Sequence, residues 1–313
     1  MTILGIVVRS MVVLVWLGVI TMQVAIVRIA TRGDLTGPQR AWQGKRLVYA
    51  LSIEDASGLN RPLGSCRWQS DAQGAGQRVD CSFTITEVRA IPGVKPLLPL
   101  LDQLNPQAEA PAGPAPAAGH AARPASHRPP PLTVHLTQLS GADGVVASLA
   151  AEASYGELGA SLDARFLDQG LQVSWQTPLS DGSRSFPPLH GVRSVAVIGV
   201  LPSRIRIGRS FSIPMLGADT AGLGPRLNQA RFHCTAEEEV ITNLGALLLS
   251  RVEEDGDDHR LAATLWCDDS GLVYRQRWED LAITLELTRI EPGSRPDHAT
   301  TPPAVAPRAQ AEP

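Results

Sequence analysis

"LWCDDSGLVYRQRW", residues 265 to 278, decides the fold class of this chain. Alternating residues flank the tetrapeptide 268–271, whose Asp, Ser and Gly residues are common turn formers. With 268–271 as a hairpin turn, one register gives a mainly apolar and a mainly polar face, and a one-residue slip would invert both. The apolar face then pairs Cys267 with Leu272, Leu265 with Tyr274, Ala263 with Gln276 and Leu261 with Trp278. The stretch therefore indicates a β-hairpin and not a metal site or an active-site loop.

The same alternation recurs along the chain and predicts a mainly β fold. A second hairpin, over 161–177, turns at Asp168 and Gln169. It pairs Phe166 with Leu171, Ala164 with Val173 and Leu162 with Trp175. Three more strands each carry their apolar residues on one face: Leu47, Tyr49, Leu51 and Ile53; Val79, Cys81, Phe83 and Ile85; Leu281, Ile283, Leu285 and Leu287.

The N-terminal run 10–27 is uncharged and lies between Arg9 and Arg28. Its 18 residues reach the lower end of the length of a membrane-spanning helix. A cleaved signal peptide usually has a shorter apolar region and a small-x-small site, and "RIATRGD" at 28–34 is a poor one. We therefore expect a transmembrane helix that serves as an uncleaved, single-pass anchor in the inner (cytoplasmic) membrane.

Seven segments follow from these patterns. Residues 105–131 are mostly Ala, Pro and Gly, a composition that buries too little apolar surface to offset chain entropy. The predicted segments are an N-terminal flank (1–9), the anchor (10–27), a connector (28–45), a first β segment with a possible short helix (46–104), a disordered Ala/Pro-rich insert (105–131), the main β segment (132–290) and a disordered tail (291–313).

Cys66 and Cys81 form the one predicted disulfide. With 72–75 as the loop of a hairpin, the two cysteines fall directly opposite each other. Opposed Cβ atoms lie about 4.5 to 5.5 Å apart, and a disulfide needs about 3.5 to 4.5 Å. Two buried free thiols are the alternative. A bridge indicates an oxidising compartment, so we expect the soluble domain outside the cytoplasm. The Lys and Arg residues that follow the span would instead place it in the cytoplasm by the positive-inside rule.

The segment between Cys234 and Cys267 allows two interpretations. A hairpin would turn at 243–245, and a helix would begin with a capping box of Thr235 and Glu238. We favour the hairpin. With a further turn at Asp255 and Gly256, a simple meander would place the two sulfurs roughly 20 to 30 Å apart, at about 3.4 Å per residue.

Most familiar chemistries have no support in the sequence. The formal net charge of -3 gives no electrostatic footprint for nucleic acid. Phosphate-loop, dinucleotide-binding and G-x-S-x-G motifs are all missing from the sequence.

His233 and Cys234 are adjacent, so in a strand they point to opposite faces and cannot share a site. The acidic stretches 253–259 and 267–271 lack the spacing of a calcium loop. We predict no catalytic, cofactor-binding or metal-binding residue. An acid/base site made of carboxylates that only folding brings together stays an open alternative.

"LPSRIRIGRSFSIP" (201–214) followed by "LWCDDSGLVYRQRW" resembles bacterial envelope domains of uncharacterised function that have a curved, lipoprotein-carrier-like antiparallel sheet. The resemblance covers residues 155–290, and the chain departs from it in its cysteines and its Ala/Pro-rich insert. It implies a half-barrel-like sheet with a concave apolar face, and it implies no catalytic residue.

Three functional hypotheses follow. The first is a non-enzymatic, membrane-anchored envelope protein whose β-domain binds or scaffolds a protein, a lipid or an apolar ligand. The second is an accessory subunit of a secretion or pilus-type envelope assembly, an analogy that rests on the anchor, the spacer and the β-domain. The third is a hydrolase whose site is not visible in the sequence.

The anchor gives the first testable prediction. The protein should keep its N-terminus and stay with membranes through a high-salt or carbonate wash, because 10–27 would lie in hydrocarbon. Fractionation followed by N-terminal sequencing measures both properties. Recovery of a soluble form that begins near residue 30 would contradict the anchor.

Overall fold

Antiparallel strands make up nearly all of the chain that the computed structural model describes. The described residues are 27–31, 44–55, 57–91, 129–142, 145–177, 181–188, 192–197, 201, 204–219, 224–255 and 261–292. Within them, sixteen strands form one sheet in the order β10-β1-β11-β12-β13-β14-β15-β16-β2-β3-β4-β5-β6-β7-β8-β9. The mainly β, antiparallel prediction is confirmed.

Two meanders build this sheet. The first runs through β2 (Lys45–Glu54), β3 (Asn60–Gln73), β4 (Gly76–Ile85), β5 (Leu132–Ser140), β6 (Val146–Tyr155), β7 (Leu158–Leu167), β8 (Gly170–Gln176) and β9 (Asp181–Phe186). The second runs through β11 (Ser210–Asp219), β12 (Gly224–Thr242), β13 (Gly245–Asp255), β14 (Leu261–Cys267), β15 (Val273–Trp278) and β16 (Ile283–Pro292). A 3-10 turn, η1 (Val88–Ala90), follows β4.

The two meanders are joined by strands that are far apart in sequence. The last strand, β16, pairs with β2, the first strand of the first meander. At the other side of the second meander, β1 (Val27–Thr31) lies between β10 (Val192–Val197) and β11. Part of the predicted connector, 28–31, thus belongs to the sheet. The two β segments separated by the Ala/Pro-rich insert likewise share one sheet.

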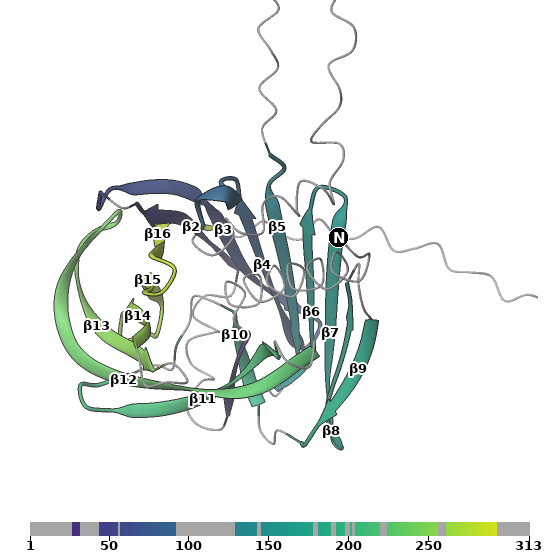
Figure 1. Ribbon diagram of the computed structural model, residues 1–313. Helices are drawn as coiled ribbons and strands as arrows, with labels where there is room; N and C mark the ends of the chain where they lie inside the picture. Colours follow the sequence, from purple (N-terminus) through teal and green to yellow (C-terminus); the bar gives the residue numbers. More distant parts are fainter. Residues whose placement is uncertain are drawn as a thin grey trace, which may run out of the picture.

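The sheet curls so that its two halves face each other (Figure 1). β10 lies against β5 and β6, and β12 approaches the edge strand β9. The buried side chains of both meanders form a single apolar cluster between the halves. We call the face that carries these side chains the inner face and the opposite face the outer face.

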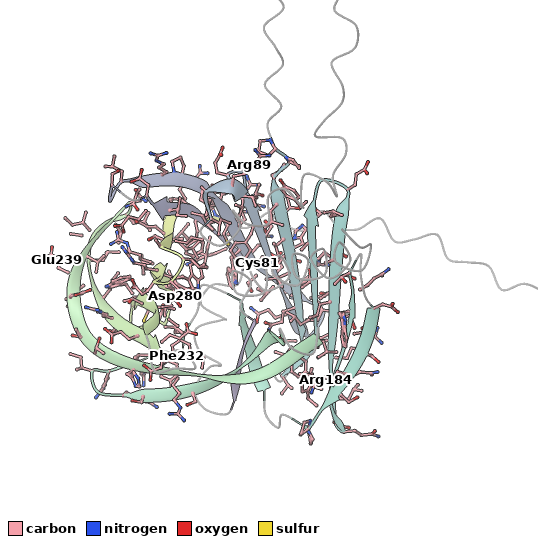
Figure 2. All side chains as sticks on the ribbon, in the orientation of Figure 1. Cys81, Arg89, Arg184, Phe232, Glu239 and Asp280 are labelled. Carbon is pink, nitrogen blue, oxygen red and sulfur yellow. The ribbon has the colours of Figure 1, made fainter. Side chains whose placement is uncertain are left out.

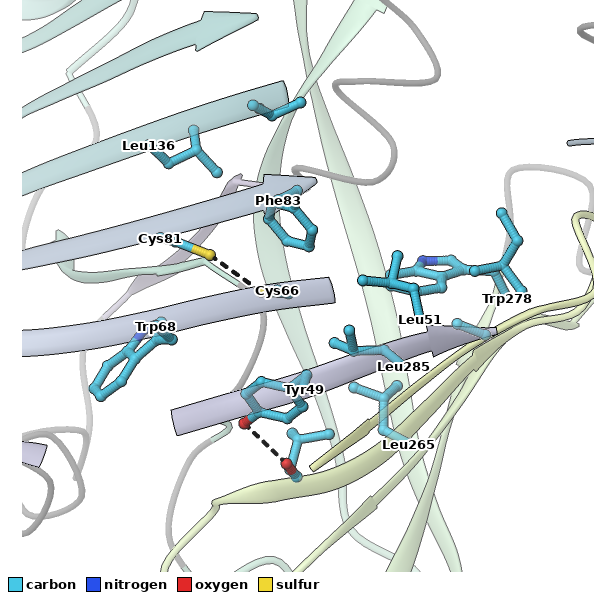
Figure 3. Close-up of a cluster of buried hydrophobic side chains, with 14 of the residues drawn as sticks. Tyr49, Leu51, Cys66, Trp68, Cys81, Phe83, Leu136, Leu265, Trp278 and Leu285 are labelled. Carbon is cyan, nitrogen blue, oxygen red and sulfur yellow. Dashed lines mark hydrogen bonds between the residues drawn. The ribbon is translucent and has the colours of Figure 1, made fainter. Parts of the chain in front are cut away.

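The inner face follows the alternation in the sequence. In β2, Leu47, Tyr49, Leu51 and Ile53 are all buried, as predicted. The Tyr49 hydroxyl donates to the Val273 carbonyl at 3.1 Å, which links β2 to β15 across the interior (Figure 3). Burial raises the pKa of Tyr49 well above its ordinary value, so this hydroxyl keeps its proton and stays a donor.

Two predicted hairpins are present, one in the predicted register and one shifted. Leu162 faces Trp175, Ala164 faces Val173 and Phe166 faces Leu171, as predicted. In the hairpin at 268–271, Leu265 instead faces Gln276, and Ala263 faces Trp278. Cys267 pairs with Val273, so the turn moves the register by one residue, and a bulge between Trp266 and Cys267 adds a second. Because the total shift is two, Leu265, Ala263, Gln276 and Trp278 stay on their predicted buried face.

The turn of this second hairpin is held by its own side chain. Asp268 Oδ1 accepts from the backbone N–H groups of Ser270, at 2.9 Å, and Leu272, at 3.1 Å. Gly271 adopts a positive φ of 83°, which glycine reaches without steric cost. The acidic stretch 267–271 therefore serves as an Asx turn.

The segment after Cys234 is a hairpin, as favoured, with β12 and β13 joined through Asn243 and Leu244. The predicted separation of Cys234 from Cys267 is wrong. β13 ends at Asp255 and β14 begins at Leu261, so the tight turn at Asp255 and Gly256 is replaced by a longer connection. Cys267 consequently pairs with Ser250, and Cys234 pairs with Val252, so both cysteines flank β13 close to each other.

The tip of the β12–β13 hairpin folds over the outer face of the second meander. Trp266, Arg275 and Glu286 form a row across β14, β15 and β16. Trp266 Nε1 donates to Glu238, Arg275 donates to the Ile241 carbonyl at 2.7 Å, and Glu286 accepts from the Asn243 backbone at 3.0 Å. A bulge between Cys234 and Ala236 interrupts β12 before this crossing. Glu239, on the far side of the hairpin, points away from the body of the molecule (Figure 2).

The predicted Cys66–Cys81 disulfide is not present. The β3–β4 turn is tighter than predicted, because Gln73 pairs with Gly76. The register therefore moves by two residues, so Cys66 faces Phe83 and Cys81 faces Trp68. The sulfurs are diagonal neighbours 3.6 Å apart, and both thiols are free (Figure 3). The bridge was the main reason to place the domain outside the cytoplasm, and that placement now rests on the envelope resemblance alone.

The described residues contain no helix that is long and apolar enough to cross a membrane. The predicted anchor lies outside them except for Val27, which begins β1. The possible short helix within 92–104, residues 105–128 of the insert and the tail from 293 also lie outside the described residues.

The junction of the two meanders gives the second testable prediction. Leu285 in β16 is fully buried and pairs with Leu51 in β2. Leu285→Ala should lower the free energy of unfolding by about 2 to 5 kcal/mol, because it leaves a cavity at this junction. Denaturant unfolding of the detergent-solubilised chain measures the change. Leu248→Ala is the matched control, since Leu248 is 70% exposed and its truncation should cost no more than about 0.5 kcal/mol.

The four cysteine thiols give the third testable prediction. Burial raises the pKa of Cys66, Cys234 and Cys267, and the thiolate is the reactive form. The native protein should react slowly with a thiol reagent, and the protein denatured without reductant should show all four thiols. Leu59→Cys supplies an accessible reference thiol, because Leu59 is 65% exposed. Two thiols that appear only after reduction would contradict the free pair.

Candidate functional site

The inner face offers a ligand no open apolar surface among the residues that pack there. Phe83, Leu136 and Leu285 are at most 1% exposed, and side chains of both halves cover one another. The concave apolar face implied by the resemblance is thus filled by the protein's own core. The outer face is therefore the surface that a partner can reach.

Two adjoining hollows lie on the outer face of the first meander, over β5 to β9. Their volumes are about 590 and 950 Å³. They share Glu152, Ser161, Gln176 and Thr177, so we treat them as one feature, the β5–β9 groove. The other polar side chains of its lining are Thr133, His135, Ser154, Asp163, Ser174, Asp181 and Ser183.

Cross-strand pairing explains why the groove is polar. Leu162 and Ala164 point to the core, so Ser161 and Asp163, which alternate with them along β7, point outward. Ser161 faces Gln176, which faces Asp181, so one row of polar side chains crosses β7, β8 and β9.

Hydroxyl, amide and carboxylate groups give the groove its chemistry. Three carboxylates line it, those of Glu152, Asp163 and Asp181, and Arg165 pairs with Asp163 at 2.9 Å. The hydroxyl groups of Thr133 and Ser154 lie 2.7 Å apart at one end. The arrangement suits a ligand that forms many hydrogen bonds and carries positive charge.

Trp175 supports the groove from beneath. It faces Gly182, and a Cβ atom on that glycine would lie 2.5 Å from the indole ring. The indole thus occupies the space that a side chain at 182 would fill. Its Nε1 is buried and has no hydrogen-bond partner among the described residues.

The groove reaches an edge of the sheet. β9 pairs with β8 on one side and is the last strand in the described order. Its sequence, DGSRSF, carries two charged residues, and Arg184 donates to the Pro225 carbonyl at 3.3 Å. Edge strands present backbone N–H and C=O groups that can pair with another extended segment.

A second cluster lies on the outer face of β11, β12 and β13. Ser210 faces His233 across β11 and β12, with Oγ and Nδ1 3.2 Å apart. His233 Nε2 lies 2.7 Å from Asp255 Oδ2. The imidazole thus connects a hydroxyl group on one side to a carboxylate on the other.

The sequence did not single out this cluster. The prediction that His233 and Cys234 point to opposite faces is confirmed, since Cys234 is buried while the His233 side chain is 38% exposed. The partners of His233 are instead 23 and 22 residues away in sequence. Only the correct registers of the β11–β12 and β12–β13 hairpins would have identified Ser210 and Asp255 as these partners.

The described residues contain no group of three or more His, Cys, Asp or Glu side chains that could hold a metal ion. Residues 256–259 of the acidic stretch 253–259 lie outside them. The predictions of no metal and no cofactor stay predictions.

Comparison with known proteins adds little. The chain matches no protein family model and no curated protein. A solved structure, a DUF1089 family protein from Pseudomonas aeruginosa, is similar over 69% of this chain and 90% of its own, at 11% identity and a TM-score of 0.31. A likeness this weak supports no statement about fold or function. The resemblance to envelope domains therefore stays a prediction.

Proposed function

We propose that this chain is a membrane-anchored envelope protein whose β-domain binds a partner protein through the β5–β9 groove and the edge strand β9. The groove is the observation that carries the proposal. It is a polar hollow of about 950 Å³ in its larger part, and it adjoins a strand edge. The anchor predicted at 10–27 would keep the domain at the membrane surface.

A protein partner fits this surface better than an apolar ligand. An apolar ligand needs an apolar pocket, whereas hydroxyl, amide and carboxylate side chains line the groove. An extended peptide can pair its backbone with an edge strand and place alternate side chains on the neighbouring face. Beside β9 that face is the groove, and its carboxylates favour basic and hydrogen-bonding side chains.

Site-specific photocrosslinking provides the fourth testable prediction. A photoreactive amino acid in place of Ser183, which lines the groove on β9, should give a discrete protein adduct in membranes of the native host. The same amino acid in place of Gln172 is the control. Gln172 is exposed on the outer face of the adjacent strand and is not part of the groove lining.

Charge reversal makes the test specific. Asp181→Lys should reduce the yield of the Ser183 adduct severalfold, because it replaces a groove carboxylate with a cation. Gln172→Lys introduces a positive charge on β8 and should leave the yield unchanged. Equal adducts from positions 183 and 172, or none from either, would contradict the proposal.

A further inference from the structure

We propose that Ser210, His233 and Asp255 form a nucleophile, base and carboxylate that hydrolyse carboxylic esters on the outer face of β11 to β13. A nucleophile within hydrogen-bond reach of a base, and a third group that orients the base, are the geometric signature of an activated serine. The distances of 3.2 Å and 2.7 Å meet that requirement. The site is separate from the groove, which lies on the first meander.

The carboxylate fixes the tautomer of the imidazole. An ionised Asp255 can only accept a hydrogen bond, so His233 Nε2 carries the proton and donates it. Nδ1 is then left with its lone pair and faces Ser210 Oγ. The Ser210 O–H therefore donates to Nδ1, which is the arrangement that a general base requires.

The position of Ser210 leaves it open to a substrate. It is the first residue of β11, directly after a turn in which the Arg209 N–H donates to the Arg206 carbonyl at 3.0 Å. Ser210 and Ser212 are both exposed. The exposed Ser210 hydroxyl on the sheet surface can meet an ester carried on a larger molecule.

Arg231 supplies positive charge on the face that carries the nucleophile. It is exposed, lies two residues before His233 in β12, and faces Ser212 on one side and Asp255 on the other. Residues two apart in a strand share a face, so its guanidinium is on the side of the sheet where the reaction takes place. Such a cation stabilises the oxyanion of a tetrahedral intermediate.

The reaction balances with water as the second reactant. Ser210 Oγ bonds to the ester carbonyl carbon while its proton moves to His233 Nδ1. The carbon–oxygen bond to the alcohol then breaks, and the departing oxygen takes the proton from Nδ1. Water attacks the resulting acyl-serine, gives a proton to Nδ1, and Ser210 recovers that proton as the carboxylic acid leaves.

The fifth testable prediction uses the full chain in detergent, with a fluorophosphonate probe and p-nitrophenyl butyrate. The probe should label Ser210, located by peptide mass spectrometry. Ser210→Ala should abolish both labelling and hydrolysis. His233→Ala should slow hydrolysis by roughly 10² to 10⁴-fold, the usual contribution of a general base.

Ser212→Ala is the matched control. Ser212 is on the same strand and the same face and is also exposed, so its loss should leave labelling and hydrolysis unchanged. Asp255→Asn should lower the rate while the probe still finds Ser210, because it removes the group that fixes the tautomer. Circular dichroism of each variant separates a lost site from a lost fold.

Two outcomes would overturn the proposal. One is folded wild-type protein that the probe does not label at Ser210. The other is hydrolysis that survives in Ser210→Ala, which would mean that the imidazole acts alone on an activated ester. Neither outcome bears on the groove, so the binding proposal stands or falls by its own experiment.

Discussion

The pairing of β16 with β2 is the constraint on which the rest of the structure depends. It joins the end of the second meander to the start of the first, so one sheet extends through both. Its register brings Ile283 opposite Ile53, Leu285 opposite Leu51 and Leu287 opposite Tyr49, all of them buried. The two halves can enclose one core only because this pairing holds their edges together. Contacts between residues so distant in sequence cost more loop-closure entropy than local hairpins, and this apolar row offsets that cost.

The inward concentration of apolar side chains determines where chemistry can occur. A strand that buries every second residue leaves the others on the opposite face. The outer face therefore collects Ser, Thr, Gln, Asp and Arg over both meanders, in the β5–β9 groove and in the row from Ser210 to Asp255. The tip of the β12–β13 hairpin covers part of this face, and Arg275 and Glu286 hold it there. The two proposed sites lie on parts of the outer face that this tip leaves uncovered.

Much of the fold could be predicted from the sequence, because period-two alternation reports directly on burial. The buried faces of β2 and β4 were predicted residue by residue, as were Ile283, Leu285 and Leu287 in β16, whereas Leu281 precedes that strand. The 161–177 hairpin was predicted in its observed register. Registers that depend on bulges or tight turns were predicted wrongly. The turn after Cys267 and the bulge beside it together moved one hairpin by two residues, and the tight turn that pairs Gln73 with Gly76 moved another by two. The β16–β2 pairing and the place of β1 between β10 and β11 left no local signal, since neither involves neighbouring segments.

A two-residue shift explains why sites are harder to predict than folds. Such a shift keeps every side chain on its own face, so burial patterns cannot detect it. It still decides which side chains meet. In β3 and β4 it turns an opposed cysteine pair into diagonal thiols 3.6 Å apart. In β11 and β12 the same shift would put Ser212 opposite His233, and Ser210 would lose its base. The position of a reactive group on this sheet therefore depends on turn geometry and bulges, while the hydrophobic pattern fixes only the face on which it lies.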